Sequence, residues 1–428
     1  MKGTLEDIPE LCNRYGIHSI IIAIPTLKGS KLNHVIDLCV STHCAVQLLS
    51  DPQLVGSGAP QQGAFRELNP ADFLSRDEVT LDTDQISGYL TGKTVLVTGG
   101  GGSIGSELCR QVMRFKPGKL LIFDIYENCA YELLMELQQK YGRDIPVTVL
   151  IGSIRDKKRL DEVFETYHPT VVFHAAAHKH VPLMEVSPAE AVKDNVLGTK
   201  NLLVSASEHD VERFVQLSTD KAVNPTSVMG RTKRICEMLI QTFAGNTDMK
   251  CVAVRFGNVL GSHGSVIPLF EAQIKKGGPV TLTDPNIERY FMTIPEAAQL
   301  VLQAGALAES GNIYVLDMGE PVKIMDLAKQ LIRFYGYEPG VNMEIKIVGL
   351  RPGEKLYEEL MMDEEQDKMR RTQHNKIFVA SPRSIDLAEF YEQLQELAKA
   401  AQHNDEGVVQ QLAKMIPTFT PTRQNLKL

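Results

Sequence analysis

The chain has 428 residues, more than one compact core usually spans, so two domains or one domain with a large extension are expected. Its 43% hydrophobic and 23% charged residues are typical of a globular protein, and a net charge of −8 gives no general attraction to nucleic acid or acidic lipid. Seven scattered cysteines show no paired metal-ligand spacing and no apolar run approaches the ~18 residues of a membrane span, so we expect no metal site and a cytoplasmic location for the chain as given.

Residues 1–50 have the pattern of part of a separate α/β unit. Thr4, with Asp7 at the third position, can cap a helix that ends near Tyr15. Helices and strands are expected in turn at 4–15, 18–24, 31–40 and 45–49. Two strands and two helices cannot cover a parallel sheet well, so we expect a partial N-terminal α/β domain without chemistry. Residues 51–92 are expected to form a linker with one or two short helices.

Residues 93–260 show a regular alternation of strand and helix patterns. Strands are expected near 94–98, 119–123, 146–151, 170–175, 212–217 and 250–255, and helices near 103–115, 127–141, 156–167, 188–208 and 227–245. Such alternation indicates a parallel sheet covered by helices on both faces. The sequence therefore predicts a doubly wound, Rossmann-like α/β fold.

A glycine cluster follows the first of these strands, and Gly99, Gly102 and Gly105 stand three apart. Glycines at this spacing make a tight turn, let the backbone approach a pyrophosphate and let a helix pack on a strand, while the helix N-terminus offers N–H groups to the anion. The next strand ends in Asp124, about 20 residues on, where an acid can bind the ribose hydroxyls of adenosine. Because no arginine follows Asp124, the sequence favours NAD over NADP; a glycine turn in an unrelated α/β protein is the alternative.

The pattern loosens after about residue 260, where glycines and prolines recur. Short strands are expected near 280–283, 312–317 and 344–349. We expect residues 261–382 to form mainly a smaller substrate-binding lobe. Residues 383–428 are expected to be C-terminal helices, near 385–401 and 405–415, that serve packing.

Two strand ends carry candidate site residues. The strand near 170–175 ends in the small residues Ala175, Ala176 and Ala177, which would let a nicotinamide and its ribose lie close to the sheet. The strand near 212–217 is followed by a hydroxyl, an acid and an amine in succession: Thr219, Asp220 and Lys221. Strand ends face the ligand crevice of such sheets, although a solvated loop ion pair is the alternative interpretation for the last two.

The chain resembles the extended short-chain dehydrogenase/reductase superfamily, and within it the nucleotide-sugar 4,6-dehydratases of bacterial polysaccharide and glycan synthesis. The resemblance covers about residues 93–382, and its motifs occur in the family's order. These motifs are Thr98-Gly-Gly-Gly-Gly-Ser-Ile-Gly105, His174-Ala-Ala-Ala-His-Lys-His-Val-Pro182, Asn195-Val-Leu-Gly-Thr199, Ser218-Thr-Asp-Lys221, Arg255-Phe-Gly-Asn-Val259, Arg289-Tyr-Phe-Met-Thr293 and Arg351-Pro-Gly-Glu354.

One catalytic position departs from the superfamily pattern. The usual set is Ser or Thr, then Tyr four residues before Lys; Thr219 and Lys233 fit, but Met229 stands in the tyrosine position. A thioether has no ionisable proton, so Met229 cannot take a proton from a substrate hydroxyl. The large membrane-associated dehydratases also carry methionine there. The resemblance thus implies a cytoplasm-facing part of a longer protein anchored in the inner membrane.

The resemblance implies dehydration of a UDP-linked hexose, most simply UDP-N-acetylglucosamine, to a 4-keto-6-deoxy sugar with NAD recycled internally. Lys221 is expected to act as base at C5 and Asp220 as acid at the C6 hydroxyl. Thr219 would bind the C4 oxygen, and Lys233 the nicotinamide ribose. The base for the C4 hydroxyl stays open between Asp220 and a water, and Met229 together with the N-terminal extension favours retention at C5.

Further binding residues follow from the same resemblance. Arg255 and Arg351 are the expected diphosphate partners, because a guanidinium can bind two phosphate oxygens at once. The other expected substrate contacts are Lys179, Asn195, Asn258, Arg289 and Glu354. The expected cofactor contacts are Thr98, Gly99, Gly102, Ser103, Ile104, Gly105, Asp124, Ser153, Ile154, Ala175, Ala176, Ala177 and Lys233.

Two other functions stay open at this point. A C4 epimerase or reductase of the same fold would also use NAD, but it needs no acid–base pair to expel water. A non-catalytic NAD-sensing protein would have lost its tyrosine, yet it would not be expected to keep three arginine motifs. Helices 188–208 and 227–245 could form a four-helix contact in a homodimer or higher oligomer.

Overall fold

The computed structural model describes residues 2–24, 29–42, 44–49, 65–68, 72, 79–380 and 385–417. By its contacts the chain forms two compact units, each built from separate stretches of sequence. Unit 1 comprises Met1–Glu78, Val259–Thr293 and Glu320–Gly349, and unit 2 comprises Val79–Asn258, Ile294–Gly319 and Leu350–Leu428. Of the predicted linker 51–92, the structure describes residues 65–68, 72 and 79–92, which hold a short helix, as predicted, and a strand that was not predicted. The assignment of functions to sequence domains stays a prediction.

Unit 2 is organised around a nine-stranded sheet in the order β17-β18-β14-β9-β8-β7-β4-β5-β6. The strands in chain order are β4 (Thr94–Thr98), β5 (Lys119–Asp124), β6 (Val147–Ile151), β7 (Val171–His174), β8 (Arg213–Leu217), β9 (Lys250–Arg255), β14 (Ile313–Leu316), β17 (Arg370–Arg371) and β18 (Ile377–Ala380). Six neighbouring pairs are parallel, and β18 and β17 are added at one edge in antiparallel pairs. The strand order reverses between β4 and β7, which is where open α/β sheets bind ligands.

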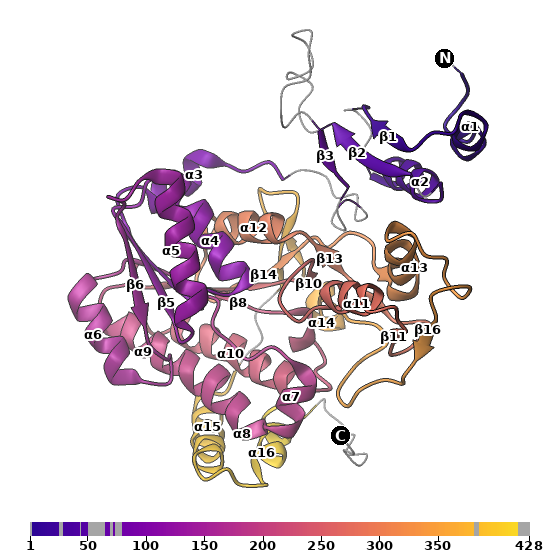
Figure 1. Ribbon diagram of the computed structural model, residues 1–428. Helices are drawn as coiled ribbons and strands as arrows, with labels where there is room; N and C mark the ends of the chain where they lie inside the picture. Colours follow the sequence, from indigo (N-terminus) through magenta and orange to yellow (C-terminus); the bar gives the residue numbers. More distant parts are fainter. Residues whose placement is uncertain are drawn as a thin grey trace. The chain divides into compact units, whose positions relative to one another are not determined.

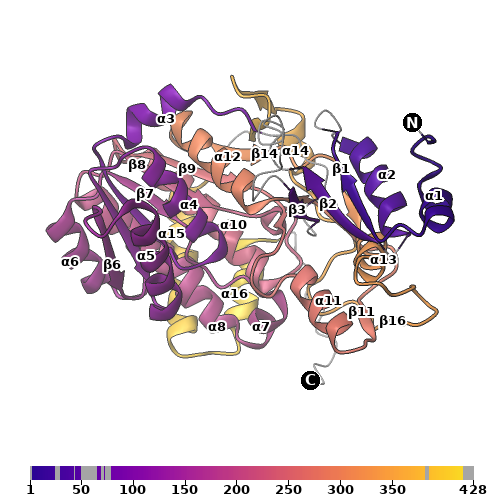
Figure 2. The same ribbon diagram turned by 45° about the horizontal axis from the view of Figure 1, so that its top comes forward.

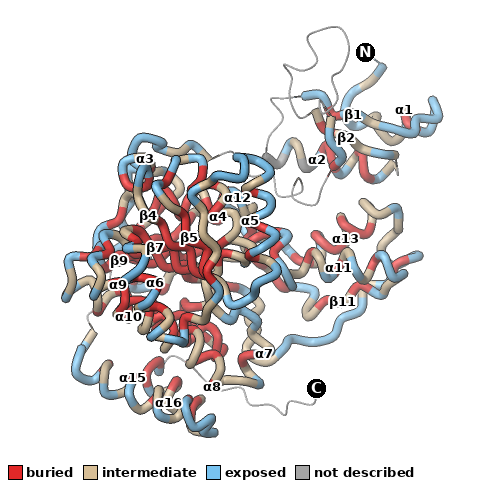
Figure 3. The backbone as a smooth tube through the Cα atoms, turned by 60° about the vertical axis from the view of Figure 1, so that its left-hand side comes forward, coloured by how far each residue is buried: buried red, intermediate tan, exposed pale blue. Residues whose placement is uncertain are grey.

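Helices cover both faces of this sheet, as predicted. One face carries α3 (Thr83–Leu90), α4 (Ser103–Arg114), α5 (Glu127–Tyr141) and α12 (Ile294–Ala306), of which α4 and α5 lie together over β4 and β5 (Figure 1). The other carries α6 (Lys157–Tyr167), α7 (Val181–Val186), α8 (Pro188–Ala191), α9 (Thr199–Glu208) and α10 (Val228–Ala244). The central strands are apolar and buried on both sides, red in Figure 3, because helices exclude water from each face.

Three predictions for unit 2 need correction. The expected helix 188–208 is interrupted by a π-helix, Val192–Gly198, between α8 and α9. The strand expected near 312–317 in the substrate lobe is β14, which pairs with β9 in the central sheet. The helix α12, which packs on α4, was not predicted.

The two C-terminal helices, α15 (Leu387–Gln402) and α16 (Val408–Met415), pack against the protein as expected. They contact helices that the sequence offered for a dimer contact. Phe390, Leu394 and Leu412 belong to the same buried cluster as residues of α10 and the π-helix, and α8 and α16 lie side by side (Figure 2). The structure therefore covers helices that the sequence offered for a four-helix dimer contact. The dimer contact itself stays a prediction.

Unit 1 combines the N-terminal region with most of the predicted lobe. The N-terminal part holds α1 (Ile8–Tyr15), α2 (Gly29–Val40) and a small sheet of β1 (Ser19–Ile22), β2 (Ala45–Leu49) and β3 (Phe65–Glu67). The rest holds α11 (Val266–Lys275), β11 (Val280–Leu282), β12 (Glu288–Arg289), β13 (Phe291–Met292), β15 (Val322–Lys323), α13 (Ile324–Phe334) and β16 (Ile345–Ile347). Its helices α11 and α13 were not predicted.

One hydrophobic core joins the two parts of unit 1. Ile36 and Cys39 of α2 belong to the same buried cluster as Leu327 and Leu331 of α13, and Gln330 donates to Asp37 at 3.1 Å. The N-terminal part thus docks on the lobe. Its first helix begins at Ile8 rather than at residue 4, because the Thr4–Asp7 hydrogen bonds close a turn before the helix.

Candidate active site

A glycine loop joins β4 to α4 at the point where the strand order reverses. Gly99 has φ +66°, and a Cβ there would lie 2.6 Å from the backbone nitrogen of Ala176. A Cβ on Gly105 would collide with the carbonyl oxygen of Gly99, so the helix can pack this closely only with glycine. Gly102 is exposed and is the N-cap of α4, with Ser103 and Ile104 in the first helical turn. The loop therefore leads directly into the N-terminus of α4, and helix N-termini of this kind bind pyrophosphates through their backbone N–H groups.

Asp124, at the end of β5, lies against this loop. Its Oδ2 accepts a hydrogen bond from the Gly101 backbone N–H at 2.8 Å, and its Oδ1 accepts from the Tyr126 N–H at 2.9 Å. The two bonds fix the carboxylate beside the glycine turn. This is the arrangement that the spacing of the two motifs predicted, and the ribose contact itself remains a prediction.

Two of the other predicted cofactor residues, Thr98 and Ile154, have buried side chains. Thr98 is fully buried and its Oγ1 lies 2.8 Å from Nδ1 of His174, so its side chain braces the sheet and is not available to a ligand. Burial lowers the pKa of His174 to about 3, and this ring is neutral. Ile154 is also buried, and Ser153 accepts the backbone N–H of Arg155. The side chains of Thr98 and Ile154 are therefore part of the protein interior, and the cofactor contacts predicted for these two residues stay predictions.

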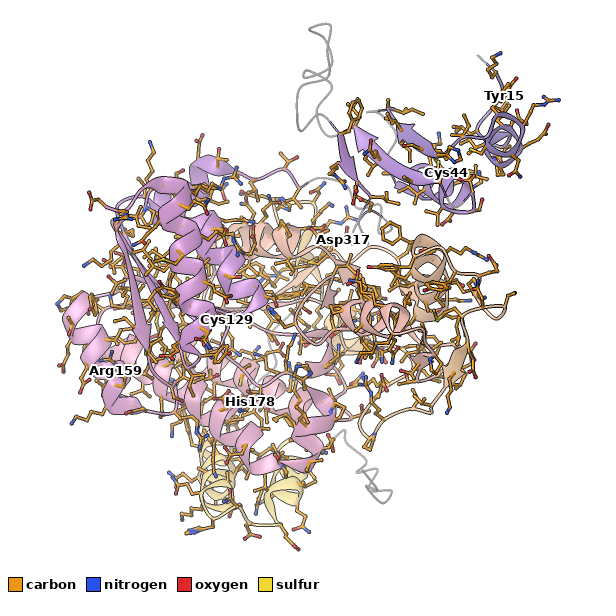
Figure 4. The ribbon with its side chains drawn as sticks, viewed as in Figure 1. Tyr15, Cys44, Cys129, Arg159, His178 and Asp317 are labelled. Atoms are coloured by element: carbon orange, nitrogen blue, oxygen red, sulfur yellow. The ribbon has the colours of Figure 1, made fainter. Side chains whose placement is uncertain are left out.

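The segment after β7 carries the partly exposed residues Ala175, Ala176 and Ala177 and then the exposed residues His178 and Lys179 (Figure 4 labels His178). Asn195 holds this segment, because its Oδ1 accepts the His178 N–H at 2.8 Å and its Nδ2 donates to the His178 carbonyl at 3.1 Å. Nδ2 also donates to Thr232 at 2.9 Å, and Asn195 is buried. Asn195 therefore positions the strand-end loop, and its predicted role as a substrate ligand is wrong.

The predicted hydroxyl, acid and amine form one cluster at the end of β8. Oδ1 of Asp220 accepts from Thr219 Oγ1 at 2.8 Å and from Lys221 Nζ at 2.9 Å. Asp220 is fully buried and its Oδ2 has no hydrogen-bond partner among the described residues, whereas 21% of the Lys221 side chain is exposed. Lys221 Nζ also donates to Oδ1 of Asn258 at 3.2 Å. The solvated-ion-pair interpretation is therefore excluded.

Helix α10 packs closely against this cluster. Its N-terminus is capped by Ser227, and Oε1 of Glu185 accepts the Val228 N–H at 2.7 Å. A Cβ on Gly230 would collide with the carbonyl oxygen of Lys221, so glycine lets the helix approach the cluster. Gly230 was missed as a site residue, although it stands beside the methionine that replaces tyrosine.

Lys233 and Met229 lie on α10 as the spacing predicted. Lys233 is buried and donates from Nζ to the Leu217 carbonyl at 2.6 Å. Burial lowers the pKa of Lys233, against the opposing effect of nearby acidic groups. Met229 is 4% exposed, and its thioether packs in the hydrophobic core.

Arg255 lies in a buried ion cluster with Glu237, Glu365 and Arg234. All five of its N–H groups are used: Nε and Nη2 donate to Glu237, Nη1 and Nη2 to Glu365, and Nη1 to the Leu360 carbonyl. Arg255 has no exposed surface, so the prediction that it binds a diphosphate is wrong. The cluster fastens the segment that begins at residue 351 to β9 and α10.

Arg351 is the predicted diphosphate ligand that stays accessible, with 55% of its side chain exposed. Glu354 accepts from Nε of Arg351 at 3.2 Å and from Nη2 at 3.1 Å, which orients the guanidinium. Thr226 Oγ1 donates to the Gly353 carbonyl at 3.0 Å, so this turn packs beside the segment that follows Lys221. Arg289 belongs to unit 1, where it is buried on β12 and donates to the Glu288 carbonyl at 2.7 Å.

The strand order and the glycine loop place the chain in the class of Rossmann-type nucleotide-binding proteins. The solved structure of Pen from Bacillus thuringiensis is 35% identical, with a TM-score of 0.64 over 69% of this chain and 90% of that one. The structure of UDP-glucose 4-epimerase from Thermus thermophilus shares the fold at 24% identity, with a TM-score of 0.55 over 62% of this chain and 90% of that one. Among the residues that the structure describes, no helix is long and apolar enough to cross a membrane.

The family model described as polysaccharide biosynthesis protein matches residues 95–382. The capsular polysaccharide biosynthesis protein CapD of Staphylococcus aureus is 53% identical over 84% of this chain and 60% of the relative. The UDP-N-acetylglucosamine 4,6-dehydratase (inverting) of Campylobacter jejuni is 34% identical over 62% of this chain and 76% of the relative. The chain therefore belongs to the polysaccharide biosynthesis protein family, within the extended short-chain dehydrogenase/reductases. It spans 60% of the length of CapD and of EpsC from Bacillus subtilis.

Proposed function

We propose that the protein removes water across C5 and C6 of a UDP-linked hexose, giving a 4-keto-6-deoxy sugar nucleotide, with UDP-N-acetylglucosamine as the substrate. The observation that carries the proposal is the cluster at the end of β8, where Asp220 binds both Thr219 and Lys221. Elimination of water needs an acid and a base close together, and this cluster supplies both. The name of the 34% identical relative supports the choice of sugar.

The glycine loop fits NAD as the cofactor. The close approach at Gly99 and Gly105 leaves no room for side chains, and Gly102 leaves the N-terminus of α4 accessible. Backbone N–H groups of the first turn of α4 would hold the pyrophosphate, and Asp124 the adenosine ribose. Bound NAD supplies a hydride acceptor at C4 and a hydride donor at C6, so the reaction has no net redox change.

The C4 hydroxyl needs a base, because Met229 cannot accept its proton. We assign this role to Asp220 acting through Thr219, whose hydroxyl already donates to Oδ1 of Asp220 at 2.8 Å. The C4 hydroxyl donates its proton to Thr219 Oγ1 as Thr219 passes its own proton to Asp220. Asp220 then carries the proton that the next step consumes.

Lys221 and Asp220 then expel water. The neutral amine of Lys221 takes the C5 proton, the C5–H electron pair forms the C5–C6 double bond, and the C6 oxygen leaves with the proton from Asp220. Lys221 finally returns its proton to C5 as C6 is reduced. Lys233 contributes positive charge at the end of β8, where the C4 oxygen carries developing negative charge.

Substrate binding is assigned to the accessible candidates. Arg351 has a half-exposed guanidinium oriented by Glu354, which suits it to a diphosphate. Lys179 is exposed on the segment after β7, and Asn258 lies at Lys221, so both are proposed as sugar contacts. The substrate contact predicted for Arg289 stays a prediction. We retain the expectation that C5 keeps its configuration.

We also propose that the protein acts at a membrane surface and as a homo-oligomer. A relative named as a membrane protein, MJ1061 of Methanocaldococcus jannaschii, is 47% identical over 70% of this chain and 89% of the relative. Fractionation of cells that express the protein from its native gene, and light scattering of the purified chain, test the two statements. Recovery in the cytosol would refute the first, and a monomeric mass the second.

The test of the reaction is a mass measurement. The purified chain is incubated with NAD and UDP-N-acetylglucosamine, and the expected product is lighter by one water. An epimerase would leave the mass unchanged, and a protein that only senses NAD would bind it without converting the sugar; either outcome refutes the proposal. Proton NMR of the product then distinguishes retention from inversion at C5.

A further inference from the structure

A second buried carboxylate, Glu358, faces the amine of Lys221. Its Oε1 lies 3.9 Å from Nζ, and only 4% of its side chain is exposed. Neither the sequence motifs nor the comparisons assign a role to Glu358. Lys221 is therefore surrounded by Asp220 Oδ1 at 2.9 Å, Asn258 Oδ1 at 3.2 Å and this carboxylate.

The position of Glu358 is fixed from both sides of the chain segment that carries it. On the N-terminal side, Lys355 Nζ donates to the Val223 carbonyl at 3.0 Å. On the C-terminal side, Arg255 donates to the Leu360 carbonyl at 3.0 Å and to Glu365 at 2.8 Å. Because these bonds reach the loop after Lys221 and the strand β9, Glu358 is held at the amine by the fold.

Two hydrogen-bond acceptors and a second carboxylate around one amine suit an ammonium group, which has three N–H donors and no lone pair. In this state Lys221 cannot act as a base. Before it can take the C5 proton of the sugar, it must give up one of its own protons. The proposed reaction therefore needs a proton acceptor near Nζ that is not already occupied with the C4 hydroxyl.

We propose that Glu358 is this acceptor, a positioning residue that acts through Lys221 and sets its protonation state. The inference rests on the proposed dehydration. One Nζ–H bond of Lys221 breaks and one O–H bond forms on Glu358, which leaves a neutral amine and a carboxylic acid. The amine then takes the C5 proton and later returns it to C5, and Glu358 gives its proton back to Lys221. No other reactant is consumed.

The remaining charged groups near Lys221 are engaged elsewhere. Asp220 receives the proton of Thr219 in the proposed reaction. Glu359 is exposed and binds Lys355 and Asn224. Arg234 and Arg255 are paired with Glu237 and Glu365, two cations with two anions.

This role predicts a characteristic dependence of rate on pH. A lysine and a glutamate that share one proton keep a constant fraction in the neutral form over a range of pH, so the wild-type rate is flat near neutrality. Without Glu358, Lys221 must lose its proton to solvent. The rate of Glu358→Gln then rises about tenfold per pH unit until the pKa of Lys221 is reached.

The experiment measures initial rates of water loss between pH 6 and 9.5, by about half-unit steps, for wild type, Glu358→Gln and the matched control Glu359→Gln. We expect flat neutral profiles for wild type and Glu359→Gln, and for Glu358→Gln a rate at least about tenfold lower at pH 7 that approaches wild type at alkaline pH. Glu358→Asp should keep the flat profile at a reduced rate. A Glu358→Gln profile parallel to wild type would show a merely structural role and overturn the inference.

A second measurement needs no turnover. Competitive labelling of Lys221 by acetic anhydride, read by mass spectrometry of its peptide, reports the fraction of neutral amine at each pH in the chain without substrate. If Glu358 takes the proton of Lys221, labelling of the wild type should be nearly independent of pH near neutrality, whereas labelling of Glu358→Gln should rise about tenfold per pH unit until Lys221 is neutral. An unchanged labelling curve would overturn the inference, whereas absence of water loss by the wild type would overturn only the proposed function.

Discussion

Replacing Arg255 by methionine tests whether this arginine is structural or binds substrate. The change removes five hydrogen bonds and leaves the fully buried Glu237 and the nearly buried Glu365 with Arg234 as the remaining guanidinium of the cluster. Breaking a buried ion pair on one side typically costs about 3–5 kcal/mol, because it leaves an uncompensated buried charge. We expect Arg255→Met to lose about that much unfolding free energy.

The assay is urea unfolding followed by circular dichroism, together with calorimetric titration of UDP. Arg351→Met is the matched control, because its guanidinium is half exposed and its ion pair contributes at most about 1 kcal/mol. Arg351→Met should keep near-wild-type stability and bind UDP more weakly. The reasoning is refuted if Arg255→Met unfolds within about 1 kcal/mol of wild type, above all if it loses UDP binding.

Three other changes have direct outcomes. Gly105→Ala should abolish NAD binding, measured by calorimetry, because the new Cβ would collide with the Gly99 carbonyl. The control Gly245→Ala, whose Cβ would have nothing within 4 Å, should bind NAD normally. Normal binding by both variants would contradict the loop geometry. Lys221→Ala should stop water loss while NAD still binds, and near-normal turnover would exclude it as the base. Burial raises the pKa of Glu237, but the guanidinium groups of Arg255 and Arg234 outweigh it and hold the pKa at about 2. The folded state therefore gains stability from Glu237 above its unfolded pKa of about 4.3, and thermal melts should show this stability lost as pH falls from there toward 2; a midpoint unchanged across that window would refute the assignment.

The central sheet was predictable because its signals are local. Each strand of the sequence 93–260 is an apolar run, each is followed by a helical period, and the glycine spacing marks the first turn. The cluster of Thr219, Asp220 and Lys221 was predictable for the same reason, since the three residues are consecutive and follow a buried strand. Residues that directly follow a parallel strand must lie at the carboxyl end of the sheet, so the sequence alone predicts both the strand and the place of these side chains.

The roles of Arg255 and Asn195 were not predictable, because they depend on partners far along the chain. Arg255 is buried by Glu237 and by Glu365, which stand 18 and 110 residues away. Asn195 is held by His178 and by Thr232, 17 and 37 residues away. A motif records that a residue type is required, but only the folded chain shows whether it faces a ligand or another side chain.

The helices offered for a dimer contact illustrate the same limit. Helix α10 has an apolar pattern that suits either an intermolecular or an intramolecular partner. The residues that cover it, in α15 and α16, come more than a hundred positions later. Their apolar pattern predicted that they pack, but not that they pack on α10. An amphipathic face specifies that it must be buried, not by which part of the protein.

In the proposed reaction Asp220, through Thr219, takes the C4 proton in place of the tyrosine that Met229 replaces, and Glu358 sets the protonation state of Lys221. A tyrosine would accept the C4 proton near the cofactor. Without it, the proposed proton transfers all fall to side chains around Lys221, whose amine lies beside two buried carboxylates. Glu358 is held there because Arg255 fastens its segment at Leu360 and Glu365, and Lys355 fastens it at Val223. If the proposed reaction holds, Arg255 contributes to it indirectly by keeping Glu358 at Lys221, and its loss should lower turnover even where the protein stays folded.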